Sequence, residues 1–286
     1  MAVPSSGVNL NGVGLMDKTV FITGASTGIG RSTALLFQAK GWNVIATMRS
    51  PDKSPDLSNI SNLICLPLDV TDQSTIQPAI AAATEKFGPI DVLINNAGYG
   101  LVGPYEACSE AEIRRQFETN VFGLMAVTSA FLPDFRHRRE GMIINIASIG
   151  GKLALPLYSL YHASKWAVEG FSDSLQYELK PFNIKVKIIE PGPIKTDFYS
   201  RSLSIAKKEG LHDYDAYVDR VLSALGKMGE SGSPPEFVAK IIYQAATDSS
   251  EQLRYPAGGN AGFLLAMRKL LPDMLMKQVI KQVTQG

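Results

Sequence analysis

A glycine-rich stretch constrains the fold of this chain more than any other feature. Residues 19–23 form an apolar run rich in β-formers, Gly24, Gly28 and Gly30 follow it, and residues 31–41 place apolar side chains at helical spacing. A strand, a glycine turn and a helix in this order begin a βαβ unit. Glycines at such a turn let the backbone approach a pyrophosphate, which the N-terminus of the helix stabilises.

Further apolar runs continue the alternation of strands and helices. These runs are unbroken, which is typical of parallel strands that are covered on both faces. The sequence therefore predicts an α/β fold, a doubly wound, Rossmann-like parallel sheet in a single domain. Strands are predicted at residues 19–23, 43–48, 63–68, 91–95, 141–146 and 185–189, with 253–256 as a candidate seventh, and helices at 31–41, 76–87, 110–135 and 158–179.

Three segments depart from this alternation. Residues 1–15 are small, polar and glycine-rich, and we expect a flexible lead-in before a dinucleotide-binding catalytic domain at residues 16–260. Residues 195–235 mix polar and aromatic side chains and are predicted to form a lid over the substrate. Residues 261–286 are predicted to form a helical tail that is broken at Pro272.

The apolar positions of this tail leave two interpretations. We expect the tail to pack over the core or over a partner subunit. The alternative is a helix on a membrane surface, with the cations Arg268, Lys269, Lys277 and Lys281 turned outward.

Composition restricts the classes of function. A net charge of +1 gives no reason to expect a nucleic acid as partner. Two cysteines and three scattered histidines offer neither a disulfide framework nor a metal site. Apolar runs stay below membrane-spanning length, and the N-terminus lacks a signal-peptide pattern. We therefore expect a cytoplasmic protein without a metal and without a membrane partner.

Tyr161 and Lys165 lie four residues apart in the predicted helix 158–179 and share one of its faces. A phenol titrates near about pH 10 and is a weak acid or base at neutral pH, but a neighbouring ammonium lowers its pKa. The pair can thus exchange a proton with a carbonyl and alcohol couple. Ser148 follows the fifth strand at the same sheet edge and can contact the same substrate oxygen. His162 points about 100° away from Tyr161 and is predicted to line the pocket or to pack.

The end of the second strand is where sites for the two nicotinamide cofactors differ. A site for NAD usually has a carboxylate there, which accepts hydrogen bonds from the ribose hydroxyls. This chain has Met48 followed by Arg49, whose guanidinium can bind a 2′-phosphate through charge-assisted hydrogen bonds. Ser26 and Thr27 can add hydroxyl donors. The sequence therefore predicts NADP(H) rather than NAD(H).

Further candidate contacts follow the third and fourth strands. Asp69, with Val70 beside it, can accept a hydrogen bond from the adenine amino group. Ala97 and Gly98 follow Asn96 and leave room for the adenosine. All these residues lie at the carboxyl edge of the predicted sheet, where open α/β folds bind ligands.

Together these residues resemble the short-chain dehydrogenase/reductase family. The ends of the second and sixth strands resemble most the branch that contains 17β-hydroxysteroid and retinol dehydrogenases. The shared motifs span most of the chain in the order of the family: Thr23-Gly24-x-x-x-Gly28-x-Gly30, Asn95-Asn96-Ala97-Gly98, Asn120, Ser148, Tyr161-x-x-x-Lys165 and Pro191-Gly192-Pro193-Ile194-x-Thr196.

The resemblance implies a role for each motif. Tyr161 would be the general acid/base, Ser148 a hydrogen-bond donor to the substrate carbonyl, and Lys165 the group that holds the nicotinamide ribose. Asn120 would hold a water that continues the proton path from Lys165, and residues 191–196 would contact the carboxamide. The implied cofactor-binding residues are Gly24, Ser26, Thr27, Gly28, Ile29, Gly30, Arg49, Asp69, Val70, Asn96, Ala97, Gly98, Tyr161, Lys165, Pro191, Gly192, Ile194 and Thr196.

We therefore expect an NADP(H)-dependent oxidoreductase that interconverts a hydrophobic ketone or aldehyde with its alcohol. The alternative is a nicotinamide-binding regulator without turnover, which would have no use for Ser148, Tyr161 and Lys165 together. Cys108 has no activating partner and is predicted to be inert. The substrate pocket is predicted to be completed by Gly100, Val102, Leu153, Leu155, Tyr158, Pro193, Phe198 and Tyr199.

We also expect a homodimer or homotetramer, since closed two-fold assemblies are the commonest. Members of the family pair the two long helices, predicted here at 110–135 and 158–179, across a two-fold axis. In this chain they carry apolar residues beyond one core-facing stripe: Phe117, Val121, Met125, Trp166, Phe171 and Leu175.

Overall fold

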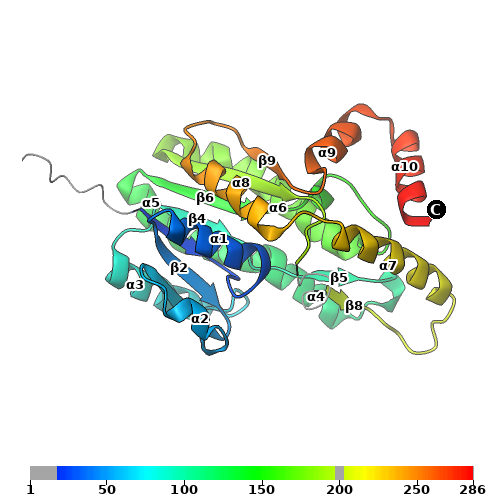
Figure 1. The fold of residues 1–286 in the computed structure, drawn as a ribbon, viewed down its shortest axis with the longest axis horizontal. Coiled ribbons are helices and arrows are strands. Elements are labelled where there is room, and N and C mark those ends of the chain that lie inside the picture. Colours follow the sequence, from blue (N-terminus) through cyan, green and yellow to red (C-terminus); the bar gives the residue numbers. More distant parts are fainter. Residues whose placement is uncertain (1–17, 197–202, 286) are drawn as a thin grey trace, which may run out of the picture.

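The computed structural model describes residues 18–196 and 203–285, and most of these residues belong to one layered α/β unit (Figure 1). Within these ranges, seven parallel strands form the central sheet in the order β3-β2-β1-β4-β6-β7-β9. The predicted doubly wound sheet is confirmed, and the candidate seventh strand is an edge strand of it. The strands are β1 (Thr19–Ile22), β2 (Asn43–Met48), β3 (Leu63–Pro67), β4 (Val92–Asn95), β6 (Gly141–Ile146), β7 (Ile184–Pro191) and β9 (Arg254–Ala257).

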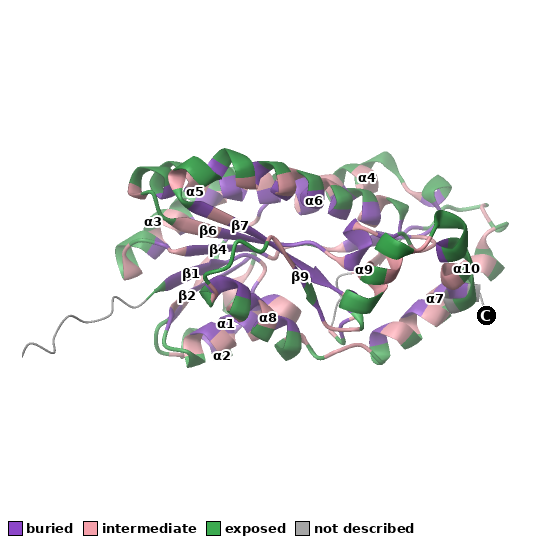
Figure 2. Ribbon diagram, turned by 90° about the horizontal axis from the view of Figure 1, so that it is seen from above, coloured by how far each residue is buried: buried purple, intermediate pink, exposed green. Residues whose placement is uncertain are grey.

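Helices cover both faces of this sheet (Figure 2). Val20 and Ile22 of β1 belong to one core cluster, whereas Phe21 between them belongs to the cluster on the opposite face. All three side chains are fully buried, which explains why the strands read as continuous apolar runs. One face carries α1 (Gly28–Ala39) and α8 (Pro235–Thr247), and the other carries α3 (Ile76–Phe87), α5 (Gly123–Arg138) and α6 (Ser159–Leu179).

The prediction of one continuous helix at residues 110–135 is wrong. Helix α4 (Glu110–Phe117) is followed by the π-helical segment η4 (Glu118–Phe122), and α5 continues from there. A π-helical turn carries an extra residue and is often found at a functional site. The segment places Asn120 in the interior, where it is 2% exposed.

The predicted lid and tail contain regular structure. Strand β8 (Leu203–Ile205) and helix α7 (Asp215–Glu230) lie within residues 195–235, and β8 pairs in parallel with β5 (Gly100–Val102), which the sequence did not predict. Beyond the sheet, α9 (Ala261–Leu270) and α10 (Asp273–Gln285) flank Pro272 (Figure 1). Side chains of both helices pack in one cluster with Leu153.

Short helices complete the described chain, and residues 1–15 of the predicted lead-in lie outside it. No helix in residues 18–196 or 203–285 is long and apolar enough to cross a membrane. The short helices are η1 (Pro51–Lys53), α2 (Pro55–Ser58), η2 (Gln73–Thr75), η3 (Tyr105–Ala107), η5 (Ile149–Gly151) and η6 (Lys180–Phe182).

The apolar residues expected at a subunit interface fall into different environments. Val121 and Leu175 are each 5% exposed and belong to the core, so their assignment to an interface is wrong. Trp166 is half exposed on α6, and Phe122 on η4 and Tyr177 further along α6, which were not predicted, are exposed as well.

Candidate active site

A cavity of about 680 Å³ opens at the carboxyl edge of the sheet. The sheet order reverses between β1 and β4, because the chain runs from β1 to β2 on one side and reaches β4 on the other. Such a switch point is where open α/β sheets bind ligands. Of the predicted site residues, those that line this cavity are Gly24, Ser26, Thr27, Gly28, Ile29, Arg49, Asp69, Val70, Asn96, Ala97, Gly98, Ser148, Tyr161, Lys165, Pro191, Gly192, Ile194 and Thr196.

The glycine turn after β1 is packed too tightly for larger residues. Gly24 and Gly28 have φ values of +66° and +54°, in the region that favours glycine. A Cβ atom at Gly30 would lie 2.4 Å from the Asn96 Nδ2 atom and 2.4 Å from the Gly24 carbonyl oxygen. Asn96 Nδ2 donates to the carbonyl oxygens of Thr23 and Gly24, each at 2.9 Å. Gly30 therefore supports the turn from behind and does not line the cavity.

The N-terminus of α1 faces this cavity and is suited to an anion. Thr27 is the N-cap residue, and within the described chain its side chain makes no capping hydrogen bond to the helix. The first turn of α1, which is described throughout, contains no acidic residue. The first backbone N–H groups of a helix have no partner within it and carry a partial positive charge. This end of the cavity therefore fits a pyrophosphate group.

The ends of β2 and β3 form the far wall of the cavity. Met48 is buried at 3% exposure, and Arg49 after it is exposed while still lining the cavity. Asp69 Oδ1 accepts hydrogen bonds from the Thr71 backbone N–H at 2.9 Å and from the Thr71 hydroxyl at 2.7 Å. This turn fixes the Asp69 carboxylate at the rim of the cavity.

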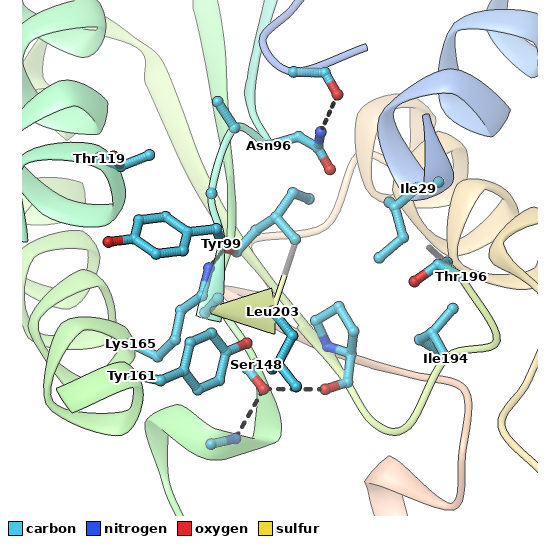
Figure 3. A pocket seen from close by; sticks show the side chains of 18 of the residues that line it. Ile29, Asn96, Tyr99, Thr119, Ser148, Tyr161, Lys165, Ile194, Thr196 and Leu203 are labelled. Atoms are coloured by element: carbon cyan, nitrogen blue, oxygen red, sulfur yellow. Dashed lines mark hydrogen bonds between the residues drawn. The ribbon is translucent and has the colours of Figure 1, made fainter. Parts of the chain in front are cut away.

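Ser148, Tyr161 and Lys165 lie together at the other end of the cavity (Figure 3). Ser148 precedes η5, accepts from the Gly150 N–H at 3.0 Å and donates to the Pro191 carbonyl at 3.5 Å. Lys165 Nζ lies 5.9 Å from the centroid of the Tyr161 ring. It also donates to the Ile146 carbonyl at 2.8 Å, and burial lowers its pKa to about 8.

Asn120 lies behind the cavity and does not line it. Its Oδ1 accepts from the Tyr99 N–H at 3.0 Å, and its Nδ2 donates to the Tyr99 carbonyl at 2.9 Å and to the Ser164 hydroxyl at 3.1 Å. Tyr99 lines the cavity and Ser164 belongs to α6. Asn120 thus joins the loop after β4 to the helix that carries Tyr161.

His162 both packs and lines the cavity, as the sequence predicted. Its ring lies 5.5 Å from the Tyr158 ring and 5.7 Å from the Tyr161 ring, measured between centroids. Its Nε2 accepts from the Leu155 N–H at 2.9 Å, which requires that this nitrogen carry no proton. Burial lowers the pKa of His162 to about 4, so the imidazole is neutral at physiological pH.

The substrate end of the cavity is largely apolar and was predicted in part. Gly100 and Val102 do not line it, because they form β5, and the predicted Phe198 and Tyr199 lie outside the described residues. Leu203, Leu225 and Met228 from the predicted lid also line the cavity and were not predicted, although apolar residues at helical spacing mark α7. Of the predicted wall, Leu153, Leu155, Tyr158 and Pro193 line the cavity.

Burial raises the pKa of the Cys108 thiol, which keeps it protonated and supports its assignment as unreactive. It does not belong to the cavity lining.

Comparisons with known proteins agree with this geometry. The sequence model described as short chain dehydrogenase matches residues 18–204. An uncharacterized oxidoreductase of Bacillus subtilis, YusZ, is 40% identical over 275 residues, 93% of this chain and 98% of its own. The 3-ketodihydrosphingosine reductase of Bacteroides thetaiotaomicron is 35% identical and covers the same shares of the two chains.

Among solved structures, ElxO with NADP bound is similar, with a TM-score of 0.70 and 28% identity. The alignment covers 87% of this chain and all of that one. Residues 18–204, which the family model matches, include the glycine turn, Ser148, Tyr161 and Lys165, so sequence and site geometry lead to the same conclusion. The chain belongs to the short-chain dehydrogenase family.

Proposed function

We propose that this oxidoreductase uses NADP(H) to interconvert a hydrophobic ketone or aldehyde with its alcohol, with Tyr161 as general acid/base. One observation carries the proposal. Ser148, Tyr161 and Lys165 line the same cavity as the glycine turn, so one dinucleotide bound in this cavity would meet both sets of residues. The apolar wall of the cavity favours a hydrophobic substrate. The name of the Bacteroides relative, a reductase of a keto compound, supports a ketone.

Different residues along the cavity would bind different parts of the cofactor. The glycine turn and the N-terminus of α1 would bind the pyrophosphate, Asp69 and Val70 the adenine, and residues 191–196 the nicotinamide end. Arg49 would pair with the 2′-phosphate, since the buried Met48 cannot accept from ribose hydroxyls. The NADP-bound neighbour supports this choice of cofactor.

Residues of the chain would transfer the proton and stabilise the charge on the substrate oxygen. NADP(H), when bound, would provide the hydride chemistry at the carbonyl carbon. In reduction, Tyr161 donates its hydroxyl proton to the carbonyl oxygen, and in oxidation it takes that proton back. Ser148 Oγ donates to the same oxygen and stabilises the developing negative charge. Lys165 favours the ionised phenol, and Asn120 would continue the proton path.

The decisive experiment is a panel of carbonyl compounds followed by the loss of NADPH absorbance. We expect turnover with long-chain or cyclic ketones and little with sugars or charged acids. Tyr161→Phe, checked for an unchanged fold, is the matched control because it keeps the ring and removes the proton. Cofactor binding without turnover on every compound would favour a regulator instead.

We also propose that the protein is a cytoplasmic homodimer or homotetramer. Phe122, Trp166 and Tyr177 expose 54%, 50% and 70% of their surface on η4 and α6, which supports burial against a second subunit. Light scattering at micromolar concentration tests this, and a monomer would contradict it.

A further inference from the structure

A cluster of charged side chains lies directly behind the site. Glu169 follows Lys165 by one turn of α6, and Glu190 precedes Pro191 in β7. Both carboxyl side chains are buried, with 2% of each residue exposed. Burying a carboxylate is unfavourable unless it is paired or neutralised. Neither glutamate contributes to the proposed proton transfer, so their presence requires another explanation.

The contacts of Glu169 leave one oxygen without a conventional donor. Its Oε2 accepts from Arg254 Nε at 2.9 Å and lies 3.3 Å from Lys152 Nζ. Its Oε1 is buried and has no hydrogen-bond partner among the described residues. The Glu190 carboxyl lies beside Glu169, within its electrostatic influence. Two ionised carboxylates cannot hydrogen bond, so a proton on one of them would provide the donor that Glu169 Oε1 lacks.

Charged side chains of both signs surround the two carboxyls. Lys152 and Arg254 are positive, and they face Glu169 and Asp173, the latter bound by Arg254 Nη2 at 2.7 Å. Lys165, one turn before Glu169 on α6, is a third cation near Glu169. An ionised Glu190 would place a second negative charge directly next to that of Glu169.

The pair touches each element that positions the reacting groups. A Cβ atom at Gly151 in η5 would lie 2.7 Å from Glu169 Cγ and 3.0 Å from the Lys165 carbonyl oxygen. Ser148 precedes η5 and donates to the carbonyl of Pro191, the residue after Glu190. A displacement of either carboxyl therefore moves the ends of η5 and β7 relative to α6.

We propose that Glu190 is a positioning residue that acts in its protonated form, by donating its carboxyl proton to Glu169 and holding the end of β7 against α6. This inference rests on the proposed oxidoreductase function. Burial, and next the charge of Glu169, raise the pKa of Glu190 to about 7. When Glu190 loses its proton, the two carboxylates repel each other. The added negative charge near Lys165 and Tyr161 also disfavours the Tyr161 phenolate. Activity should therefore fall above neutral pH.

The test compares pH profiles of kcat/KM for carbonyl reduction. Glu190→Gln keeps a hydrogen-bond donor to Glu169 and cannot ionise. Near about pH 6, the kcat/KM of this variant should match that of the wild type within about twofold. Near about pH 8.5 it should exceed the wild-type value at least about fivefold, because the protonated fraction of Glu190 falls about tenfold per pH unit above its pKa. The kcat/KM of Glu190→Ala should be reduced at both pH values. Asp173→Asn, which alters the same cluster without touching Glu190, should keep the wild-type profile. Superimposable profiles for wild type and Glu190→Gln would overturn the proposal.

Infrared spectroscopy tests the protonation of Glu190 independently of turnover. The carbonyl stretch of a buried protonated carboxylic acid should be present in the wild type near about pH 6 and lost by about pH 9. It should be absent from Glu190→Gln at both values. If the wild type shows no such band at the lower pH, the inference is wrong even if the variants fail to fold. If the band is present but no carbonyl compound is reduced, the proposed function fails while the protonated pair stands.

Discussion

The stability of Glu190→Gln across pH tests the energetics of the buried carboxyl pair. The folded protein raises the pKa of Glu190 from 4.5 to about 7. Between these values the folded chain holds a proton that the unfolded chain has lost, so the free energy of unfolding falls as the pH rises. This contribution is fully present below about pH 4.5, is lost by about pH 7, and is constant above it. The loss amounts to about 3 kcal/mol, because one pH unit corresponds to about 1.4 kcal/mol.

Urea denaturation of wild type and Glu190→Gln at one protein concentration measures this loss. The difference between the two proteins cancels the titration of all groups that they share. We expect the variant to gain about 2–3 kcal/mol relative to the wild type between about pH 5 and about pH 8. Asp173→Asn serves as the control and should show no such trend. A difference in unfolding free energy that does not change with pH would refute the assignment of the proton to Glu190.

Three further substitutions address the rest of the site. Tyr161→Phe should lower kcat at least about a hundredfold with little change in cofactor affinity, and near wild-type turnover in a stopped-flow or steady-state assay would reject its role. Arg49→Ala should remove most of a ten- to hundredfold preference for NADPH, estimated from about 1.5–3 kcal/mol for a charge-assisted pair; a wild-type preference for NADH in kcat/KM would show that Arg49 is only a surface cation. Gly30→Ala should weaken cofactor binding and lower Tm, because its Cβ would collide with Asn96 and Gly24. An unchanged Tm in thermal denaturation and an unchanged cofactor affinity would contradict the packing argument.

The parts of the fold that sequence could predict are those set by local patterns. The strand-forming runs and the glycine turn carry their information in a few adjacent residues, so β1, the turn and α1 followed from the chain directly. The spacing of Tyr161 and Lys165 needed only the period of a helix. The order of strands placed Ser148 at the same edge, because parallel strands end together.

The parts that sequence missed depend on contacts between distant segments. β5 and β8 pair across about a hundred residues of chain, and neither three-residue strand has a pattern of its own. The π-helical segment at Asn120 keeps helical periodicity on both sides, so the break is invisible until Asn120 binds Tyr99 and Ser164. Val121 lies within this segment and is buried, so its assignment to an interface was wrong.

Lys165 shows how the buried charges support chemistry at neutral pH. Burial alone disfavours its ammonium, and Glu169, one turn further along α6, opposes that effect. With a pKa of about 8, roughly nine in ten Lys165 side chains are charged near pH 7. That charge is held by the Ile146 carbonyl in a site of low dielectric, where its influence on Tyr161 is screened less than in water. The negative charge of Glu169 therefore helps to preserve the cation that a phenol needs to exchange protons at this pH.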